Sequence, residues 1–315
     1  MRNSVKISIV IPSYNEQESL EELCRTTVSV LEKLNSQFEI IFVDDGSTDD
    51  SLEIMRKIYQ ADRRIKIIQF RKNYGKSAAL SAGFAASNGD IVVTMDADLQ
   101  DDPTEIPNLV AKLNEGYELV SGWKKIRHDP LTKRITSKIY NILTSFFGGI
   151  RLHDFNCGLK AYRSEVVKSI RVYGDQHRYI PVLAHSEGFR VTELPVKHHT
   201  RKYGKTKFGL SRFTHGAFDL ITVTYLTRYR KRPLHLFGFL GMISFVLGTI
   251  ISGVLTYQRI FEDKFLSNRP LLFLGILLII VGVQFFSIGL LGEMLSSASK
   301  DTDSYVVRER LGFND

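Results

Sequence analysis

Two long uncharged apolar segments constrain the fold of this chain more than any other feature. They run from Leu236 to Gln258 and from Leu271 to Gly292, and each is about 22 residues long. A helix of that length rises roughly 30 Å, which matches the hydrocarbon core of a bilayer. A pair of buried core helices is the alternative, but core helices rarely run so far without a charge. Eight glycines in the two segments suit close helix packing in lipid: Gly238, Gly241, Gly248, Gly253, Gly275, Gly282, Gly289 and Gly292. We therefore expect a two-helix transmembrane hairpin over residues 234–295.

A basic cluster directly before the first segment predicts the orientation of the hairpin. Arg228–Arg232 contains four basic residues, whereas the connecting loop 259–269 carries three basic and two acidic residues. Positively charged flanks stay on the cytoplasmic side of a membrane. The large N-terminal domain and the tail over residues 296–315 are therefore both expected in the cytoplasm. The apolar run Ile7–Ile11 is too short for a secretory signal, so we expect no signal peptide.

The charge and the cysteines narrow the class of partner. The net charge is +8, and we assign it to anionic lipid headgroups and phosphate-bearing substrates, because no nucleic-acid-binding motif accompanies it. Cys24 and Cys157 give neither a disulfide framework nor the spacing of metal ligands. Both are expected to be reduced thiols.

The first 125 residues alternate short β-rich runs with helical stretches, which is typical of a parallel, doubly wound α/β sheet. The expected strands are 6–11, 38–43, 66–70, 91–95 and 118–121. Three helices are expected: one that follows the first strand and ends near residue 34, one over 49–59 and one over 76–87. Polar clusters follow the first, second and fourth strands. Ligands of open α/β sheets bind at these carboxyl ends.

Two further segments have the apolar spacing of amphipathic helices. Residues 130–148 carry one apolar stripe: Leu131, Ile135, Ile139, Ile142, Leu143, Phe146 and Phe147. This helix either lies in the lipid headgroup layer or packs on the sheet like an ordinary surface helix. Residues 210–226, within a juxtamembrane region 209–233, are the better candidate for an interfacial helix.

The strongest chemical signal is the D-x-D pattern Asp96-Ala97-Asp98, followed by Gln100, directly after a predicted strand. Two carboxylates at this spacing can both turn towards one cation. Hard oxygen ligands suit Mg²⁺ or Mn²⁺, which keeps coordination positions open for phosphate oxygens. A D-x-D alone is a common acidic turn, so its place at a strand end is what favours a metal site.

A second acidic turn, Asp44–Asp49, follows the second strand. Ser47 or Asp49 would cap the next helix, which leaves Asp44 and Asp45 available to contact a nucleobase or a ribose. The sequence contains neither G-x-G-x-x-G nor G-x-x-x-x-G-K-[ST], so neither a dinucleotide fold nor a P-loop is supported.

Four ordered motifs resemble those of family-2 glycosyltransferases with the GT-A fold. They are Val10–Glu16, Val43–Asp49, Asn73–Lys76 and Asp96–Pro103. Together with the hairpin, they make the chain similar to the branch that uses polyprenyl phosphate, which includes dolichol-phosphate mannose synthases and undecaprenyl-phosphate sugar transferases. The resemblance implies a Rossmann-like, mostly parallel catalytic domain over residues 1–208.

The resemblance also implies roles for individual residues. Contacts to the nucleotide sugar would come from Pro12, Tyr14, Glu16, Asp44, Asp45, Lys76, Asp96 and Ala97. The Mg²⁺ or Mn²⁺ ligands would be Asp96, Asp98 and Gln100. Catalysis would involve Asp98, Asp154, Arg201 and Lys207, the last two in a basic loop that closes over phosphates. Many relatives carry Gly-x-Arg after the fifth strand, whereas this chain has Gly122-Trp123-Lys124, which leaves Arg127 or Arg134 as the phosphate contact.

The implied activity is an inverting transfer of a sugar from UDP or GDP to polyprenyl phosphate at the cytoplasmic membrane face. Lipid phosphate is already anionic, so Asp154 would orient a cation or contact a sugar hydroxyl rather than act as a base. The alternatives are a processive polysaccharide synthase and a non-catalytic nucleotide-sugar-binding protein. Two spans and the lack of Q-x-x-R-W disfavour the synthase. Expected partners are the donor, the lipid acceptor and membrane lipids but no nucleic acid, with self-association into a homo-oligomer left open.

Overall fold

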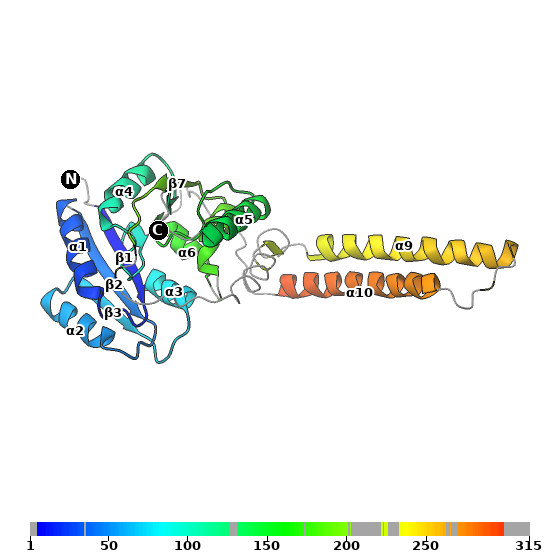
Figure 1. Cartoon of the computed structure of the whole chain (residues 1–315), viewed down its shortest axis with the longest axis horizontal. Helices are drawn as coiled ribbons and strands as arrows, with labels where there is room; N and C mark the ends of the chain where they lie inside the picture. Colours follow the sequence, from blue (N-terminus) through cyan, green and yellow to red (C-terminus); the bar gives the residue numbers. More distant parts are fainter. Residues whose placement is uncertain are drawn as a thin grey trace, which may run out of the picture. The chain divides into compact units, whose positions relative to one another are not determined.

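The structure is a computed structural model of the chain (Figure 1). It describes residues 5–34, 36–125, 131–172, 174, 176–200, 202, 222, 224–225, 233–262, 265 and 270–298, with only the backbone for 131–136 and 296–298. The described residues divide into two compact units, one up to Thr222 and one from Thr224 onward. Each unit is described by itself.

The first unit is built on a mixed sheet of seven strands among the described residues, in the order β3-β2-β1-β4-β6-β5-β7. The strands are β1 Lys6–Ser13, β2 Gln37–Asp44, β3 Ile65–Gln69, β4 Ile91–Thr94, β5 Leu119–Trp123, β6 Lys160–Arg163 and β7 Val191–Pro195. β6 is antiparallel to both of its neighbours, and the other pairs are parallel. The predicted mostly parallel α/β sheet is therefore confirmed, while β6 and β7 were not predicted.

Helices cover both faces of this sheet. One face carries α1 Leu20–Lys33, α2 Ser51–Ala61 and α4 Ile106–Asn114, and the other carries α3 Lys76–Ala86, α6 Ser164–Ser169 and α7 Ile180–Ser186. Side chains alternate along β1, so Ile7, Ile9 and Ile11 pack with the first set of helices and Val10 with the second. The two-sided burial explains why the parallel strands read as continuous apolar runs.

Helix α5, Leu131–Gly148, has one buried and one exposed face. Asn141 and Thr144 are 6% and 0% exposed, whereas Ile142 and Phe146 are 58% and 74% exposed. The predicted amphipathic helix over 130–148 is thus present: it packs on the domain and still presents a large apolar surface. The second predicted amphipathic segment, 210–226, lies almost wholly outside the described residues.

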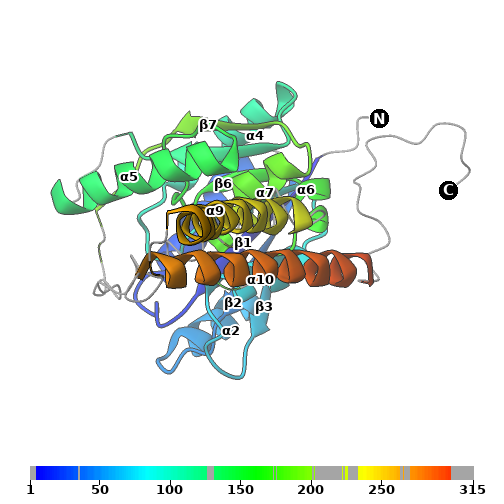
Figure 2. The same cartoon turned by 90° about the vertical axis from the view of Figure 1, so that its right-hand side faces the viewer.

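The second unit is a helical hairpin of α9 Pro233–Phe261 and α10 Pro270–Ala298, which lie side by side in both views (Figures 1 and 2). A Cβ on Gly241 would lie 2.7 Å from the carbonyl oxygen of Gly282, and one on Gly248 2.6 Å from that of Gly275. These glycines therefore allow the close backbone approach expected of helices in lipid.

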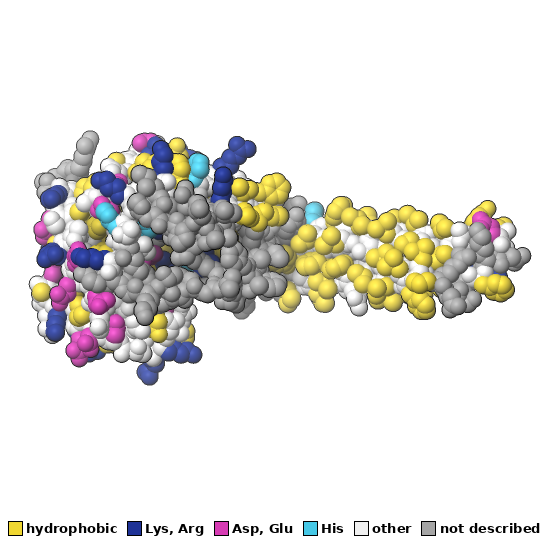
Figure 3. Space-filling view, in the orientation of Figure 1, with side chains coloured by type: hydrophobic (Ala, Val, Ile, Leu, Met, Phe, Trp, Pro, Cys, Tyr) yellow, Lys and Arg dark blue, Asp and Glu magenta, His cyan; other side chains and the backbone are white. Residues whose placement is uncertain are grey.

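The face of the hairpin that Figure 3 shows is largely apolar along α9 and α10. Only 11% of the most apolar stretch of 18 residues in each helix is buried, so these are not core helices of a globular fold. Both helices are long and apolar enough to cross a membrane, and both extend beyond the predicted segments 236–258 and 271–292.

Candidate active site at the carboxyl ends of the strands

The turns after β1 and β2 are joined to each other by hydrogen bonds, so together they form one continuous surface. The two strands are parallel and end opposite each other, so both turns leave the sheet at the same edge. Asn15 has φ of 53°, and its side-chain oxygen accepts a hydrogen bond from the backbone N–H of Thr48 at 2.8 Å. Its own N–H donates to Ser47 Oγ at 3.0 Å. Three residues that were predicted to contact the nucleotide sugar are half-buried in the turn after β1 or next to it: Pro12, Tyr14 and Glu16.

The paired carboxylates after β2 have different surroundings. Asp45 accepts hydrogen bonds from the backbone N–H groups of Tyr74 at 2.7 Å and Gly75 at 2.9 Å, one on each oxygen. Asp44 is 1% exposed, and its Oδ1 accepts from the N–H of Ser47 at 3.1 Å. Its Oδ2 is buried and has no hydrogen-bond partner among the described residues. Because an unpartnered buried oxygen is costly, Asp44 is placed to accept a bond from a ligand, while Asp45 shapes the loop before α3.

Asp96 is held in place from two sides. Lys76, the first residue of α3, forms an ion pair with its Oδ1. On the other side, a Cβ on Gly158 would lie 2.5 Å from Asp96 Cγ, so the backbone before β6 presses on this carboxylate. Desolvation alone would raise the pKa of Asp96, but Lys76, Lys124 and Lys160 outweigh it and lower that pKa below its ordinary value. The first carboxylate of the D-x-D pattern therefore stays ionised.

The rest of the D-x-D turn is connected to the chain that follows β7. Leu99 has φ of 60°, a conformation that side chains with a Cβ rarely adopt. Asp98 is 9% exposed and accepts from the N–H of Gln100 at 3.2 Å. The carbonyl of Gln100 accepts from the N–H of His199 at 2.8 Å, and its Nε2 lies 3.4 Å from His198 Nε2.

The oxygen atoms of this turn suit a divalent cation that takes its remaining ligands from phosphate. Asp98 supplies a carboxylate, Gln100 an amide oxygen, and Asp96 an oxygen besides the one engaged by Lys76. No three His, Cys, Asp or Glu side chains converge within the part of the chain that the structure describes. Mg²⁺ and its analogues need only one or two carboxylates when phosphate oxygens complete the shell. His198 Nδ1 is also buried beside this turn, where it lies 3.8 Å from Asp101 Oδ1.

Asp154 belongs to the same electrostatic cluster. It is 0% exposed, and its Oδ1 accepts from the N–H of Asn156 at 3.0 Å. Burial lowers the pKa of Lys160 below its ordinary value. Burial also acts to lower the pKa of Lys124, but acidic neighbours, with Asp101 first and Asp154 among them, outweigh it and raise that pKa. Two lysines thus connect Asp154 to the D-x-D turn.

Most of the predicted site residues meet at this edge of the sheet. The strand-end group is Asp44, Asp45, Lys76, Asp96, Ala97, Asp98 and Gln100, with Asp154 joined through the lysines. Arg201, Lys207 and Arg127 lie outside the described residues, as does the side chain of Arg134. Sequence reasoning missed Lys160 and His198. A lysine inside the short run Leu159–Tyr162 was the available signal for the first.

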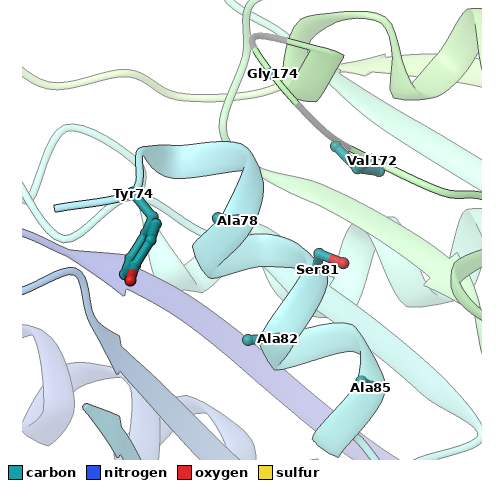
Figure 4. A pocket seen from close by; sticks show the side chains of 7 residues that line it. All are labelled: Tyr74, Ala78, Ser81, Ala82, Ala85, Val172 and Gly174. Atoms are coloured by element: carbon teal, nitrogen blue, oxygen red, sulfur yellow. The ribbon is translucent and has the colours of Figure 1, made fainter. Parts of the chain in front are cut away.

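A hollow of about 470 Å³ lies on the outer side of α3 (Figure 4). It is lined by Tyr74, Ala78, Ser81, Ala82, Ala85, Val172 and Gly174. None of these side chains is a carboxylate or a cation, so the hollow does not compete with the strand ends as a site for phosphate chemistry.

Comparison with known proteins identifies relatives along almost the whole chain. Residues 8–171 match the family described as glycosyl transferase family 2. The dodecaprenyl-phosphate galacturonate synthase of Rhizobium johnstonii is 34% identical over 97% of this chain and 93% of its own. The undecaprenyl-phosphate 4-deoxy-4-formamido-L-arabinose transferase of Salmonella choleraesuis is 38% identical over 94% of this chain and 90% of its own.

The chain also resembles a solved structure. The glucosyl-3-phosphoglycerate synthase from Mycobacterium tuberculosis, in complex with Mn²⁺, UDP-glucose and phosphoglyceric acid, aligns with a TM-score of 0.52 and 25% identity. The alignment covers 71% of this chain and 79% of that chain.

Proposed function

The chain belongs to glycosyltransferase family 2, and we propose that it transfers a sugar from a UDP- or GDP-linked donor to polyprenyl phosphate at the cytoplasmic membrane face. An acidic strand edge, whose oxygen atoms suit a divalent cation, and an apolar hairpin in one chain suit one water-soluble and one lipid-soluble substrate. This combination is the main support. The names of both relatives, a dodecaprenyl-phosphate and an undecaprenyl-phosphate enzyme, point to the same class of acceptor.

The donor would bind along the surface formed by the turns after β1 and β2. Asp44 Oδ2 would accept a hydrogen bond from the nucleoside, which relieves its buried position. Asp98 and Gln100, with Asp96, would hold a divalent cation on the pyrophosphate. When bound, that cation supplies positive charge to the departing nucleoside diphosphate. Mn²⁺ and Mg²⁺ both suit these oxygen donors.

The acceptor phosphate would attack the anomeric carbon in a single in-line displacement, which inverts the configuration there. The new bond forms from a phosphate oxygen as the bond to the nucleoside diphosphate breaks, so no proton needs to leave the nucleophile. Lys124 and Lys160 interact electrostatically with Asp154, and fixed cations of this kind would stabilise anionic groups. Arg201 and Lys207 would add charge from the basic loop.

The membrane would position the acceptor. We propose that α9 and α10 span the bilayer, with the catalytic domain and both ends in the cytoplasm. The exposed face of α5 would lie in the headgroup layer, because Ile139, Ile142, Leu143, Phe146 and Phe147 are between 37% and 74% exposed.

A transfer assay tests this function. The purified chain in lipid nanodiscs would be incubated with radiolabelled UDP- and GDP-sugars and Mg²⁺ or Mn²⁺, with and without polyprenyl phosphate. We expect a single-sugar lipid product only when polyprenyl phosphate is present. A lengthening glycan made without added lipid would point to a processive synthase, and donor binding without turnover would point to a non-catalytic binding protein.

A further inference from the structure

The inner face of α5 contacts the turn that carries Asp154. At 3.6 residues per turn, Asn141, Ser145 and Gly148 share one side of the helix, opposite the exposed apolar side. Gly148 packs so closely that a Cβ there would lie 2.8 Å from Val182 Cγ2 of α7. Helix α5 is therefore seated firmly on the domain at this point.

The side chain of Asn141 forms hydrogen bonds with the backbone on both sides of Asp154. Its Nδ2 donates a hydrogen bond to the carbonyl of His153 at 2.6 Å, and its Oδ1 accepts one from the N–H of Phe155 at 3.5 Å. Asn141 is 6% exposed; its bond with Phe155 is buried, and its bond with His153 is partly buried. One amide group thus fixes the peptide units on both sides of Asp154.

Neighbouring contacts hold the same turn from other directions. Ser145 Oγ donates to the carbonyl of Leu152 at 3.3 Å. On the far side, the N–H of His153 donates to Glu193 Oε2 on β7 at 2.7 Å, and the His153 ring stacks on Trp123 with centroids 4.2 Å apart. Among these groups, Asn141 alone bonds on both sides of Asp154.

We propose that Asn141 is a positioning residue, which holds the turn of Asp154 in the geometry needed for transfer to the acceptor and ties it to the lipid-facing helix α5. This inference rests on the proposed role of Asp154 in that transfer. Asn141 itself need not touch either substrate. Its removal should therefore change the turnover number while the affinity for the nucleotide-sugar donor stays the same.

A double-mutant cycle tests the inference. Asn141→Ala should lower kcat for polyprenyl phosphate by about 10-fold to 100-fold, with the donor Kd within about 2-fold of wild type. If Asn141 acts through Asp154, then Asp154→Asn combined with Asn141→Ala should be no slower than Asp154→Asn alone, within about 3-fold. Losses that multiply in the double variant would mean that Asn141 acts elsewhere and would overturn the inference.

Two further variants separate positioning from folding. Thr144→Val changes a buried residue on the inner face of α5. The hydrogen bonds to the turn of Asp154 come from Asn141 and Ser145 instead, so Thr144→Val should leave kcat near wild type. If Asn141→Ala does not fold, Asn141→Ser carries the cycle, because it replaces the amide with a smaller hydroxyl group that still donates and accepts a hydrogen bond. A wild-type chain that makes no lipid product would overturn the proposed function. Normal transfer by Asn141→Ala beside an active wild type would overturn only this inference.

Discussion

Gly158→Ala should disable the site, because the structure leaves no room for a Cβ at this position. The added Cβ would lie 2.5 Å from Asp96 Cγ, and 2.6 and 2.7 Å from the two carboxylate oxygens. Ordinary contacts between heavy atoms begin at roughly 3.5 Å, so the carboxylate must retreat by about 1 Å. A displacement of that size at a reacting centre costs about 10²-fold in rate, or roughly 3 kcal/mol of transition-state stabilisation.

The assay for Gly158→Ala is kcat/KM for sugar transfer at saturating Mg²⁺ or Mn²⁺, with the melting temperature measured beside it. Gly253→Ala is the matched control, because a Cβ at that position of α9 meets no heavy atom within 4 Å. We expect the control to remain active and Gly158→Ala to fold but fail. If Gly158→Ala keeps kcat/KM within about 3-fold of wild type, the position of the Asp96 carboxylate does not limit the reaction and the reasoning is refuted.

Four other substitutions test three separate parts of the molecule. Asp98→Ala should abolish transfer and the dependence of donor affinity on Mg²⁺ or Mn²⁺, as measured by titration calorimetry; near-normal turnover with chelator present would contradict the metal assignment. Arg201→Ala or Lys207→Ala should each lower kcat/KM by about 10²-fold, whereas an unchanged rate on a short soluble acceptor would indicate a role in lipid contact only. Burial would raise the pKa of Glu39, but hydrogen bonds headed by that from Lys66 outweigh it and lower the pKa. The resulting stability is present above the unfolded value of about 4.3 and is lost as pH falls through the folded pKa. The free energy of unfolding of Glu39→Gln should therefore be about 1–3 kcal/mol lower than that of wild type at neutral pH and equal to it in acid. A difference in the free energy of unfolding that stays constant with pH would contradict this.

Local sequence patterns were sufficient for the elements that are long or strongly apolar. The hairpin, the first five strands and α5 each have a periodic or continuous apolar signal within one segment. β6 has only four residues, and it begins with Lys160, which is 4% exposed. A charged residue in a buried strand makes sense only beside distant carboxylates, and no local pattern records those. β7 is likewise short and ends in Pro195.

The two carboxylates of the Asp44-Asp45 pair illustrate the same limit within the site. Sequence placed both at a strand end and could not separate their roles. The structure separates them through Tyr74 and Gly75, which lie 29 and 30 residues from Asp45 and engage both of its oxygens. The His198 contact with the D-x-D turn spans 98 residues and was invisible for the same reason.

Charge balance at the strand ends explains why the described residues need further cations. Three lysines, Lys76, Lys124 and Lys160, lie among six carboxylates at this edge of the sheet, those of Asp44, Asp45, Asp96, Asp98, Asp101 and Asp154. The cluster is therefore acidic before any substrate binds. A nucleoside diphosphate and a lipid phosphate together bring several negative charges into a partly desolvated site, where their repulsion is strong. The proposed divalent cation at Asp98 and the predicted basic loop over residues 201–207 would offset that charge. For this reason the losses in Asp98→Ala and Lys207→Ala should both appear mainly in the transition state, where the departing diphosphate carries the most charge.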